Sequence, residues 1–278
     1  MEIATQLLIY TSILGFILGF VVTKTNFCTM GAVSDWVNIG DLSRFKAWML
    51  AAAVAILGVT ILDFLSFFDI DDSRIPYRNS VLAWPRYILG GLMFGVGMTY
   101  ASGCGNKVLI RVGGGNLKSL VVLFVAGLMA YIMTRTDFYG IVFHSWMNPI
   151  SLDLAQIGIL DQSLPTIVSS VFSITNGVYF NFIIGLTVSL TMIFLIFKSG
   201  KFIKNFDNVI SGFVVGSIVV FAWLLTGGAT GVEWIEANDF LDDPAPGVGV
   251  QSFTFINPMA ETLIYFGNSA DSFYLTSV

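Results

Sequence analysis

Six stretches of the chain are long and apolar enough to cross a lipid bilayer, and they constrain the fold more than any other feature. A membrane-spanning helix needs about 20 mostly apolar residues. The stretches are 6–23, 47–65, 86–102, 117–134, 177–197 and 209–226. Charged residues make up only 11% of the chain, against about a quarter in soluble proteins. The sequence therefore predicts an all-α, polytopic membrane protein with about six spans, and it argues against nucleic acid as a partner.

Short polar segments break this pattern beside two of the spans. Residues 26–31 follow the first span and carry Cys28, and Gly103-Cys104-Gly105 follows the third. Such breaks are tolerated within a membrane only where the freed backbone groups line a cavity or a protein interior. Residues 137–175 alternate short apolar pieces with Pro149 and Pro165. We expect these pieces to form short re-entrant or interfacial helices.

The two breaks also share a spacing. In each, two glycines lie four residues apart and a cysteine follows nine residues later: Gly15, Gly19 and Cys28 in one case, Gly91, Gly95 and Cys104 in the other. Glycines at this spacing are typical of packed membrane helices in general, and we expect glycines 90, 91, 95 and 97 to admit a neighbouring helix closely. Because both units follow odd-numbered spans, the two thiols are predicted to reach similar depths from one side, where they could meet in one pore.

Basic residues indicate the orientation of the chain. The segments 24–46, 103–118 and 198–206 each hold three Lys or Arg, whereas 136–175 and 227–278 hold none. Since cytoplasmic loops are enriched in Lys and Arg, this alternation places both ends of the chain outside. Arg74, Arg78 and Arg86 run against the rule, although acidic residues accompany them.

The chemistry-bearing residues gather at the two breaks. A thiol is a weak hydrogen-bond donor and a soft, polarizable group. Nearby lysines add positive charge, and the amino ends of restarted helices add N–H donors, as in broken transporter helices that hold anions. The candidate substrate-binding residues are Cys28, Cys104, Lys24, Lys107, Gly103, Gly105 and Asn106. This combination favours a sulfur-containing anion as substrate.

Other chemistries have less support in the sequence. The two cysteines lie 76 residues apart and His144 is the single histidine, so no metal site, cofactor or catalytic residue is predicted. Simpler explanations also remain open. Either cysteine could be a small buried apolar residue, and the lysines could serve only to set the topology. Asp35 and Asp41 are expected to cap the segments that follow them.

At these residues the sequence resembles the YeeE/YedE family of bacterial inner-membrane sulfur transporters. The resemblance is carried by TNFCTMGAVSDWVNIGD, TYASGCGNKVLIRVGGGNLKSL, KSGKFIKNFDN and SFTFINP. It implies a multi-pass, hourglass-shaped fold with an internal inverted repeat and a central path along which thiosulfate passes between the thiols of Cys28 and Cys104. We therefore predict a single transmembrane transporter domain over 1–278, with 1–135 as the first repeat. Residues 176–278 would form an incomplete second repeat, because family members carry further helices and a third thiol motif.

Three functions stay open at this point. The first is an inner-membrane permease for thiosulfate or a related sulfur anion. The second is a membrane thiol oxidoreductase in which Cys28 and Cys104 form a redox pair. The third is a non-transporting membrane subunit that docks a soluble TusA-like sulfur-carrier protein at its basic inner loops.

Overall fold

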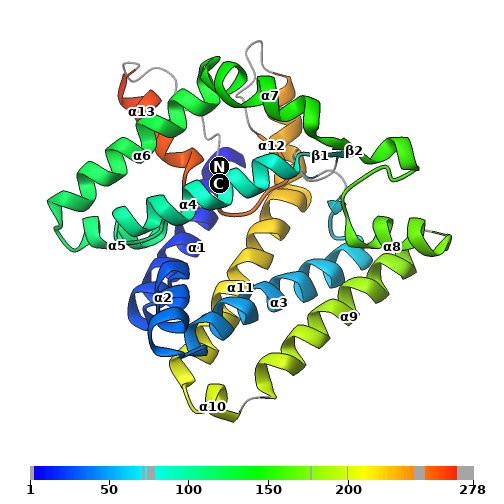
Figure 1. Cartoon of the computed structure of the whole chain (residues 1–278), viewed down its shortest axis with the longest axis horizontal. Helices are drawn as coiled ribbons and strands as arrows, with labels where there is room; N and C mark the ends of the chain where they lie inside the picture. The colour runs from blue at the N-terminus through cyan, green and yellow to red at the C-terminus, as the bar shows by residue number, and fades with distance from the viewer. Residues whose placement is uncertain are drawn as a thin grey trace. The chain divides into compact units, whose positions relative to one another are not determined.

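A computed structural model describes residues 3–70, 73, 79–175, 177–198, 200–240 and 248–267, and its regular structure is almost entirely helical (Figure 1). Within these residues, six helices are long and apolar enough to span a membrane: α1 (Ile3–Thr25), α3 (Ser43–Phe64), α4 (Trp84–Tyr100), α6 (Leu117–Arg135), α9 (Val178–Phe197) and α11 (Phe206–Gly227). All six predicted spans are thus confirmed, with ends shifted by a few residues.

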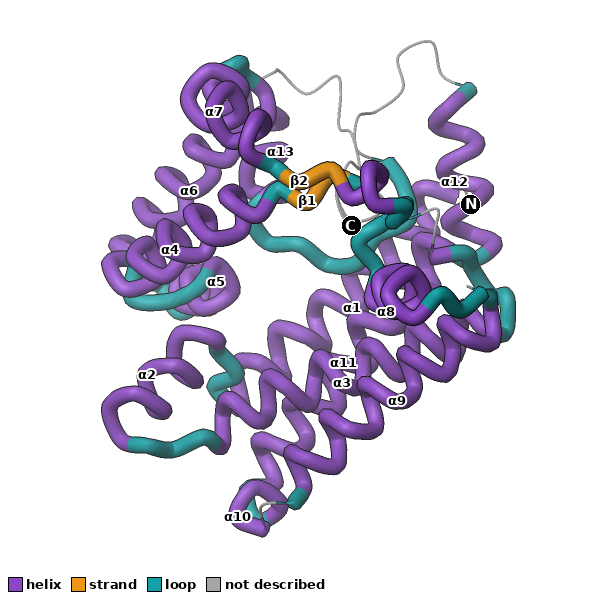
Figure 2. The backbone as a smooth tube through the Cα atoms, turned by 45° about the vertical axis from the view of Figure 1, so that its right-hand side comes forward, coloured by secondary structure: helices purple, strands orange, loops and turns teal. Residues whose placement is uncertain are grey.

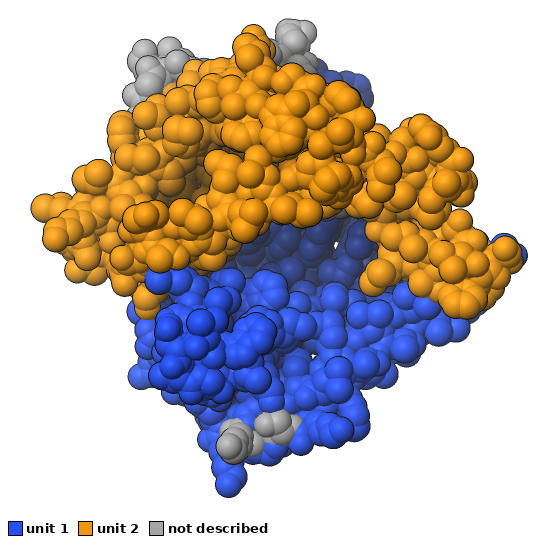
Figure 3. Space-filling model, in the orientation of Figure 1, with its two compact units in different colours: residues 1–74, 175–253, 278 blue, residues 75–174, 254–277 orange. Residues whose placement is uncertain are grey.

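The chain divides into two compact units, coloured in Figure 3. Unit 1 comprises residues 1–74, 175–253 and 278, and unit 2 comprises 75–174 and 254–277. Each unit therefore combines an early and a late part of the sequence. The units are defined by which residues contact one another, so they do not test the predicted repeats. The repeats at 1–135 and 176–278 stay a prediction.

In unit 1, α3 packs against both α9 and α11 (Figure 2). Glycines make the approach to α11 close. A Cβ built on Gly212 would lie 2.7 Å from the carbonyl oxygen of Ala47, and one on Gly216 would lie 2.6 Å from that of Ala51. Only a residue without a side chain fits such a distance, which is how small residues stabilise helix pairs in membranes.

One end of unit 1 holds a buried apolar cluster. Ala47, Leu50, Ile196 and Phe202 form it. Phe27 and Val209 pack against it, so the segment after α1 and the turn between α9 and α11 lie at the same end. Two of the basic segments, 24–46 and 198–206, therefore share an end of the unit, as the predicted orientation requires. Arg74 and Arg78 lie outside the described residues.

The remaining helices of unit 1 are short. They are α2 (Thr29–Ile39), α10 (Gly200–Ile203) and α12 (Ala229–Asp239). The polar residues Asp35, Asp41 and Arg44 predict a loop over 34–46, but this prediction is wrong, because α2 continues to Ile39 and α3 begins at Ser43. Gly40 ends α2 with a left-handed φ of 68°, a conformation that glycine adopts without steric cost. The result is a helical hairpin.

Unit 2 is built from α4, α5 (Gly105–Gly113), α6 and α13 (Asn257–Gly267). The mostly apolar run 259–266 predicts a short helix after the last span, and α13 confirms it. This helix packs along α6. A Cβ on Gly127 would lie 3.1 Å from the carbonyl oxygen of Met259. Arg135 and Glu261 form an ion pair between the same two helices.

Residues 137–175 form short pieces, as predicted. They are a π-helix (Gly140–His144), α7 (Ser145–Met147), a 3₁₀ turn (Asn148–Ile150), β2 (Leu152–Asp153), a second 3₁₀ turn (Leu154–Ile157) and α8 (Leu164–Phe172). Strand β2 pairs antiparallel with β1 (Val81–Leu82), with Val81 opposite Asp153. This small sheet was not predicted, because two-residue strands leave no alternation in the sequence.

The glycines of α4 do not behave as expected within their own unit. No atom lies within 4 Å of a Cβ built on glycines 90, 91, 95 or 97. Among the described residues of unit 2, no helix therefore lies close to these positions. Gly212 and Gly216 of α11 are the glycines at this spacing that bring two backbones together.

Candidate functional site

Cys28 lies immediately after a left-handed turn that ends α1. Asn26 adopts a φ of 52°, and the N–H of Phe27 donates to the carbonyl of Val22 at 3.2 Å. This bond spans five residues and is typical of the Schellman motif that closes helix carboxyl ends. Cys28 is then extended, with φ −158° and ψ 130°, and occupies the N-cap of α2.

Cys104 lies in the same local structure at the end of α4. Ser102 adopts a φ of 56°, and the N–H of Gly103 donates to the carbonyl of Met98 at 3.0 Å. Cys104 is extended, with φ −70° and ψ 169°, and occupies the N-cap of α5. Each cysteine therefore stands two residues after the left-handed residue and directly before a new helix, which confirms both predicted helix breaks.

The restart of a helix at the cysteine distinguishes these two turns from others. Ser66 and Ser173 also have a left-handed φ, of 57° and 53°, but neither is followed two residues later by a helix N-cap. The carbonyls of Cys28 and Cys104 accept the first helical bonds at 2.9 and 3.0 Å, while neither thiol caps its own helix. The sulfur atoms thus stand beside helix amino ends, which carry partial positive charge.

The two cysteines differ in burial. Cys28 is buried, with 9% of its surface exposed. Cys104 is half-buried and lines a cavity of about 470 Å³ in unit 2. Helices α4, α5, α6 and α13 line this open cavity, and Met98, Met129 and Met259 join Cys104 in its wall. The wall is therefore apolar and rich in sulfur.

Unit 2 holds Cys104 and the four candidate residues beside it. Gly103 is buried beneath Lys107, because a Cβ on Gly103 would lie 2.9 Å from the Cβ of that lysine. Gly105 faces α13, where an added Cβ would stand at an ordinary 3.6 Å from Met259. Asn106 and Lys107 are half-buried in the first turn of α5. Lys107 therefore lies at the helix end that carries the thiol.

The surroundings of Cys28 include a cation that the sequence reasoning missed. A Cβ built on Gly31 would lie 2.6 Å from Nη1 of Arg44 and 3.7 Å from the Cβ of Cys28. The guanidinium of Arg44 and the Cβ of Cys28 thus both lie within 4 Å of the position that a Cβ on Gly31 would take. Lys24, the predicted cation, is exposed in the last turn of α1. The clue to Arg44 was its place beyond the Gly40 turn, which folds α3 back on α2.

The two aspartates predicted as helix caps have different roles. Asp41 lies one residue before the N-cap Leu42 and satisfies the first N–H of α3 as a capping side chain would, since its Oδ1 accepts from the N–H of Ser43 at 3.0 Å and from the Ser43 hydroxyl at 2.7 Å. Asp35 was assigned wrongly. It lies inside α2, and its Oδ2 is 2.8 Å from Nε of Arg44.

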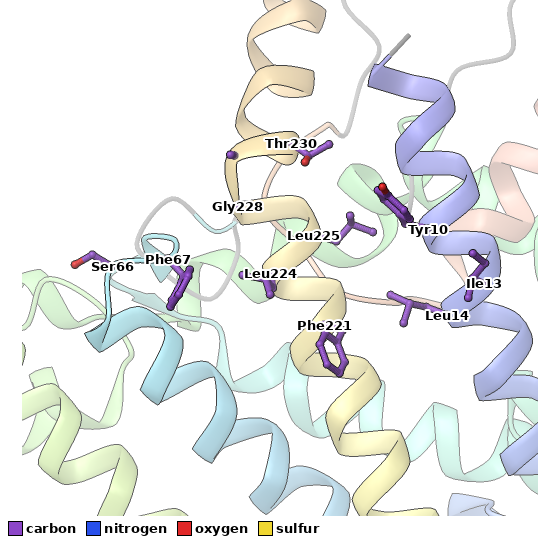
Figure 4. A pocket seen from close by; sticks show the side chains of 11 residues that line it. Tyr10, Ile13, Leu14, Ser66, Phe67, Phe221, Leu224, Leu225, Gly228 and Thr230 are labelled. Carbon is purple, nitrogen blue, oxygen red and sulfur yellow. The ribbon is translucent and has the colours of Figure 1, made fainter. Parts of the chain in front are cut away.

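Cys28 belongs to unit 1 and Cys104 to unit 2, so a meeting of the two thiols in one pore stays a prediction. A second cavity, of about 580 Å³, lies within unit 1 (Figure 4). Helix α1 lines it with Tyr10, Ile13 and Leu14, and α11 lines it with Phe221, Leu224 and Leu225. No candidate residue lies in its wall. Within the described part of the chain, no cluster of three or more His, Cys, Asp or Glu could hold a metal ion.

Comparison with known proteins places the chain in a family. The family model described as sulphur transport matches residues 24–278. The thiosulfate transporter TsuA of Escherichia coli K12 is 30% identical over 129 residues, which cover 46% of this chain and 35% of that protein. TsuA of Spirochaeta thermophila is 27% identical over 125 residues, covering 45% of this chain and 36% of that protein.

The chain thus spans about a third of the length of the curated relatives that it matches, at 35% and 36%. The family match, by contrast, includes both cysteine segments and five of the six spanning helices in full. Together with those helices, it identifies a multi-pass protein of the bacterial inner membrane. The chain belongs to the sulphur transport family, the YeeE/YedE family of bacterial membrane transporters.

Proposed function

We propose that this chain acts in an inner-membrane permease that carries thiosulfate. The observation that carries the proposal is the shared geometry of the two cysteines, each of which occupies the N-cap position of a helix that starts directly after a spanning helix. The names of the two TsuA relatives support thiosulfate as the substrate. Because both relatives are named as transporters, these names also favour transport over thiol oxidation as the function.

The chemistry of the two segments suits such an anion. A neutral thiol can donate an S–H hydrogen bond and offers a soft sulfur surface to the terminal sulfur of thiosulfate. A thiolate would repel the dianion. A relay, in which thiosulfate passes from one cysteine thiol to the other, therefore requires that both thiols stay protonated. Helix amino ends and Lys107 would stabilise the negative charge near Cys104. Broken helices hold ions in this way in other transporters.

Lys24, Lys107, Gly103, Gly105 and Asn106 enter the proposal in supporting roles. The two lysines would raise the local concentration of the anion. The glycines and the asparagine would shape the helix end beside Cys104. A soluble TusA-like carrier protein could dock at the end of unit 1 that bears segments 24–46 and 198–206. The surrounding lipid is the remaining partner of a multi-pass protein.

Uptake of sulfur-35-labelled thiosulfate into proteoliposomes tests this function. The 278-residue chain should be assayed beside a version extended to the length of the relatives. Cys104→Ser keeps a donor but replaces a soft sulfur by a hard oxygen, and Cys104→Ala removes the donor. Uptake should therefore fall in both variants, and further in the alanine variant.

Cys28→Ala with Cys104→Ala in one chain is the decisive variant. Unchanged uptake would reduce both cysteines to packing residues and overturn the relay. A Cys28–Cys104 disulfide formed in every turnover would instead support the oxidoreductase hypothesis, and non-reducing gel electrophoresis after uptake detects it.

A further inference from the structure

The α2–α3 hairpin holds Arg44 in a defined place beside Cys28. Asp35 accepts from Nε of Arg44 at 2.8 Å and fixes one edge of the guanidinium. The rings of Trp36 and Phe45, with centroids 5.3 Å apart, pack the same two helices together. A guanidinium has five N–H donors in a planar fork and keeps its charge at any physiological pH. The Nη1 edge, which faces Gly31, can therefore serve another acceptor.

We propose that Arg44 is the cation that attracts the sulfur anion to Cys28, that Asp35 positions it, and that Gly31 leaves the space it occupies. This assignment rests on the proposed function and gives Arg44 the role that the sequence suggested for Lys24. Arg44 lies beside Gly31, a residue of the first turn of α2, which directly follows the N-cap residue Cys28. Lys24 is exposed on the preceding helix.

Gly31 provides a way to displace the charge without removing it. A methyl group at this position would overlap Nη1 of Arg44, at 2.6 Å. Because Nη1 is the end of a flexible side chain, the guanidinium moves and the helix does not. Alanine also favours a helix over glycine by about 1 kcal/mol. Gly31→Ala should therefore keep the fold and all charges while shifting the guanidinium away from Cys28.

A double-mutant cycle on thiosulfate uptake tests the assignment, with the KM and the maximal rate measured separately. Arg44 is 39% exposed, so solvent screens it and its effect is modest. We expect Arg44→Gln to raise the KM about three- to fivefold and to leave the maximal rate unchanged. Gly31→Ala should also raise the KM, because it moves the guanidinium away from Cys28. The double variant should rise no further than Arg44→Gln, because glutamine carries no charge to displace.

Controls separate this effect from a general loss of charge or of glycine. Lys204→Gln removes an exposed lysine of the same unit, and Gly15→Ala adds a methyl group where no atom of the described residues lies within 4 Å. Both should keep the wild-type KM. Arg44→Lys keeps the charge but lacks the planar fork, so its KM should lie between those of the wild type and Arg44→Gln.

The outcomes distinguish this assignment from the proposed function. An unchanged KM in Arg44→Gln overturns the assignment, as does additivity in the double variant or a KM rise in Lys24→Gln that is larger than the rise in Arg44→Gln. If Arg44→Gln does not fold, as shown by gel filtration, Gly31→Ala carries the test. Equilibrium binding of thiosulfate to the detergent-solubilised chain is measured in parallel. If the wild-type chain binds thiosulfate but does not transport it, the proposed transport function is contradicted. The Kd values of the same four chains in the double-mutant cycle then decide the role of Arg44. A wild type that neither binds nor moves it contradicts both.

Discussion

At the scale of single residues, two neighbouring glycines beside Cys104 have different requirements. Gly103 lies beneath the stem of Lys107, with an added Cβ only 2.9 Å from the lysine Cβ and 3.1 Å from its Cγ. Those atoms are attached close to the backbone of α5 and cannot swing away. Gly105 faces the side chain of Met259 in α13 and those of Phe255 and Ile256 just before it, all at 3.5 Å or more. Glycine is thus needed for space at the first position only.

Gly103→Ala should therefore destabilise the protein and Gly105→Ala should not. Overpacking of this kind costs about 1–3 kcal/mol, and the shift of α5 should also lower thiosulfate uptake. Thermal unfolding in detergent, followed by tryptophan fluorescence, measures the first effect. Equal unfolding temperatures for the two variants would show that Lys107 does not pack on Gly103 as described.

At the scale of elements, glycines spaced four residues apart occur in both α11 and α1, but they bring two helix backbones together only in α11. Gly212 and Gly216 set α11 against the carbonyls of α3. Gly15 and Gly19 of α1 have the same spacing, yet within the described part of the chain no atom lies within 4 Å of a Cβ built on either. Spacing alone therefore does not reveal which glycines pack, since the neighbouring helix decides it.

Gly216→Ala should separate α3 from α11, because the new Cβ would lie 2.6 Å from the carbonyl oxygen of Ala51. Backbone cannot yield as a side chain can, so we expect a loss of at least about 1–3 kcal/mol. Gly15→Ala is the matched control and should leave the unfolding temperature unchanged or slightly raised. Thermal unfolding of both purified variants checks this. A destabilised Gly15→Ala would indicate that another part of the molecule does pack closely against α1 at Gly15.

At the scale of the whole molecule, the distribution of basic segments sets the orientation in the membrane. The structure agrees with the alternation in unit 1, where segments 24–46 and 198–206 lie at one end. The sidedness itself stays a prediction. It follows from the excess of Lys and Arg expected on the cytoplasmic side.

Labelling of single cysteines tests the orientation. Lys204, Gln156 and Glu236 are exposed, and each is replaced by cysteine in a chain without Cys28 and Cys104. An impermeant thiol reagent added outside intact cells should label positions 156 and 236 and spare 204. The reverse pattern would invert the orientation. Labelling of all three would contradict the number of spans.

The sequence by itself determined the six spanning helices, the two helix breaks and the candidate residues at Cys104. These features are local, because apolar length, glycine content and cap position act within a few neighbouring residues. Residues 103–107 came together for the same reason, since they are contiguous in the chain. Family membership followed from the same local motifs.

Only the tertiary structure decided which glycines pack, which residues line the cavity at Cys104 and which cation accompanies Cys28. Met259 reaches that cavity from α13, far along the chain from Cys104. Arg44 reaches Gly31 because the turn at Gly40 folds α3 back on α2. Such contacts depend on how helices pack in three dimensions, and helices whose surfaces are apolar on every side give no pattern that reveals their neighbours.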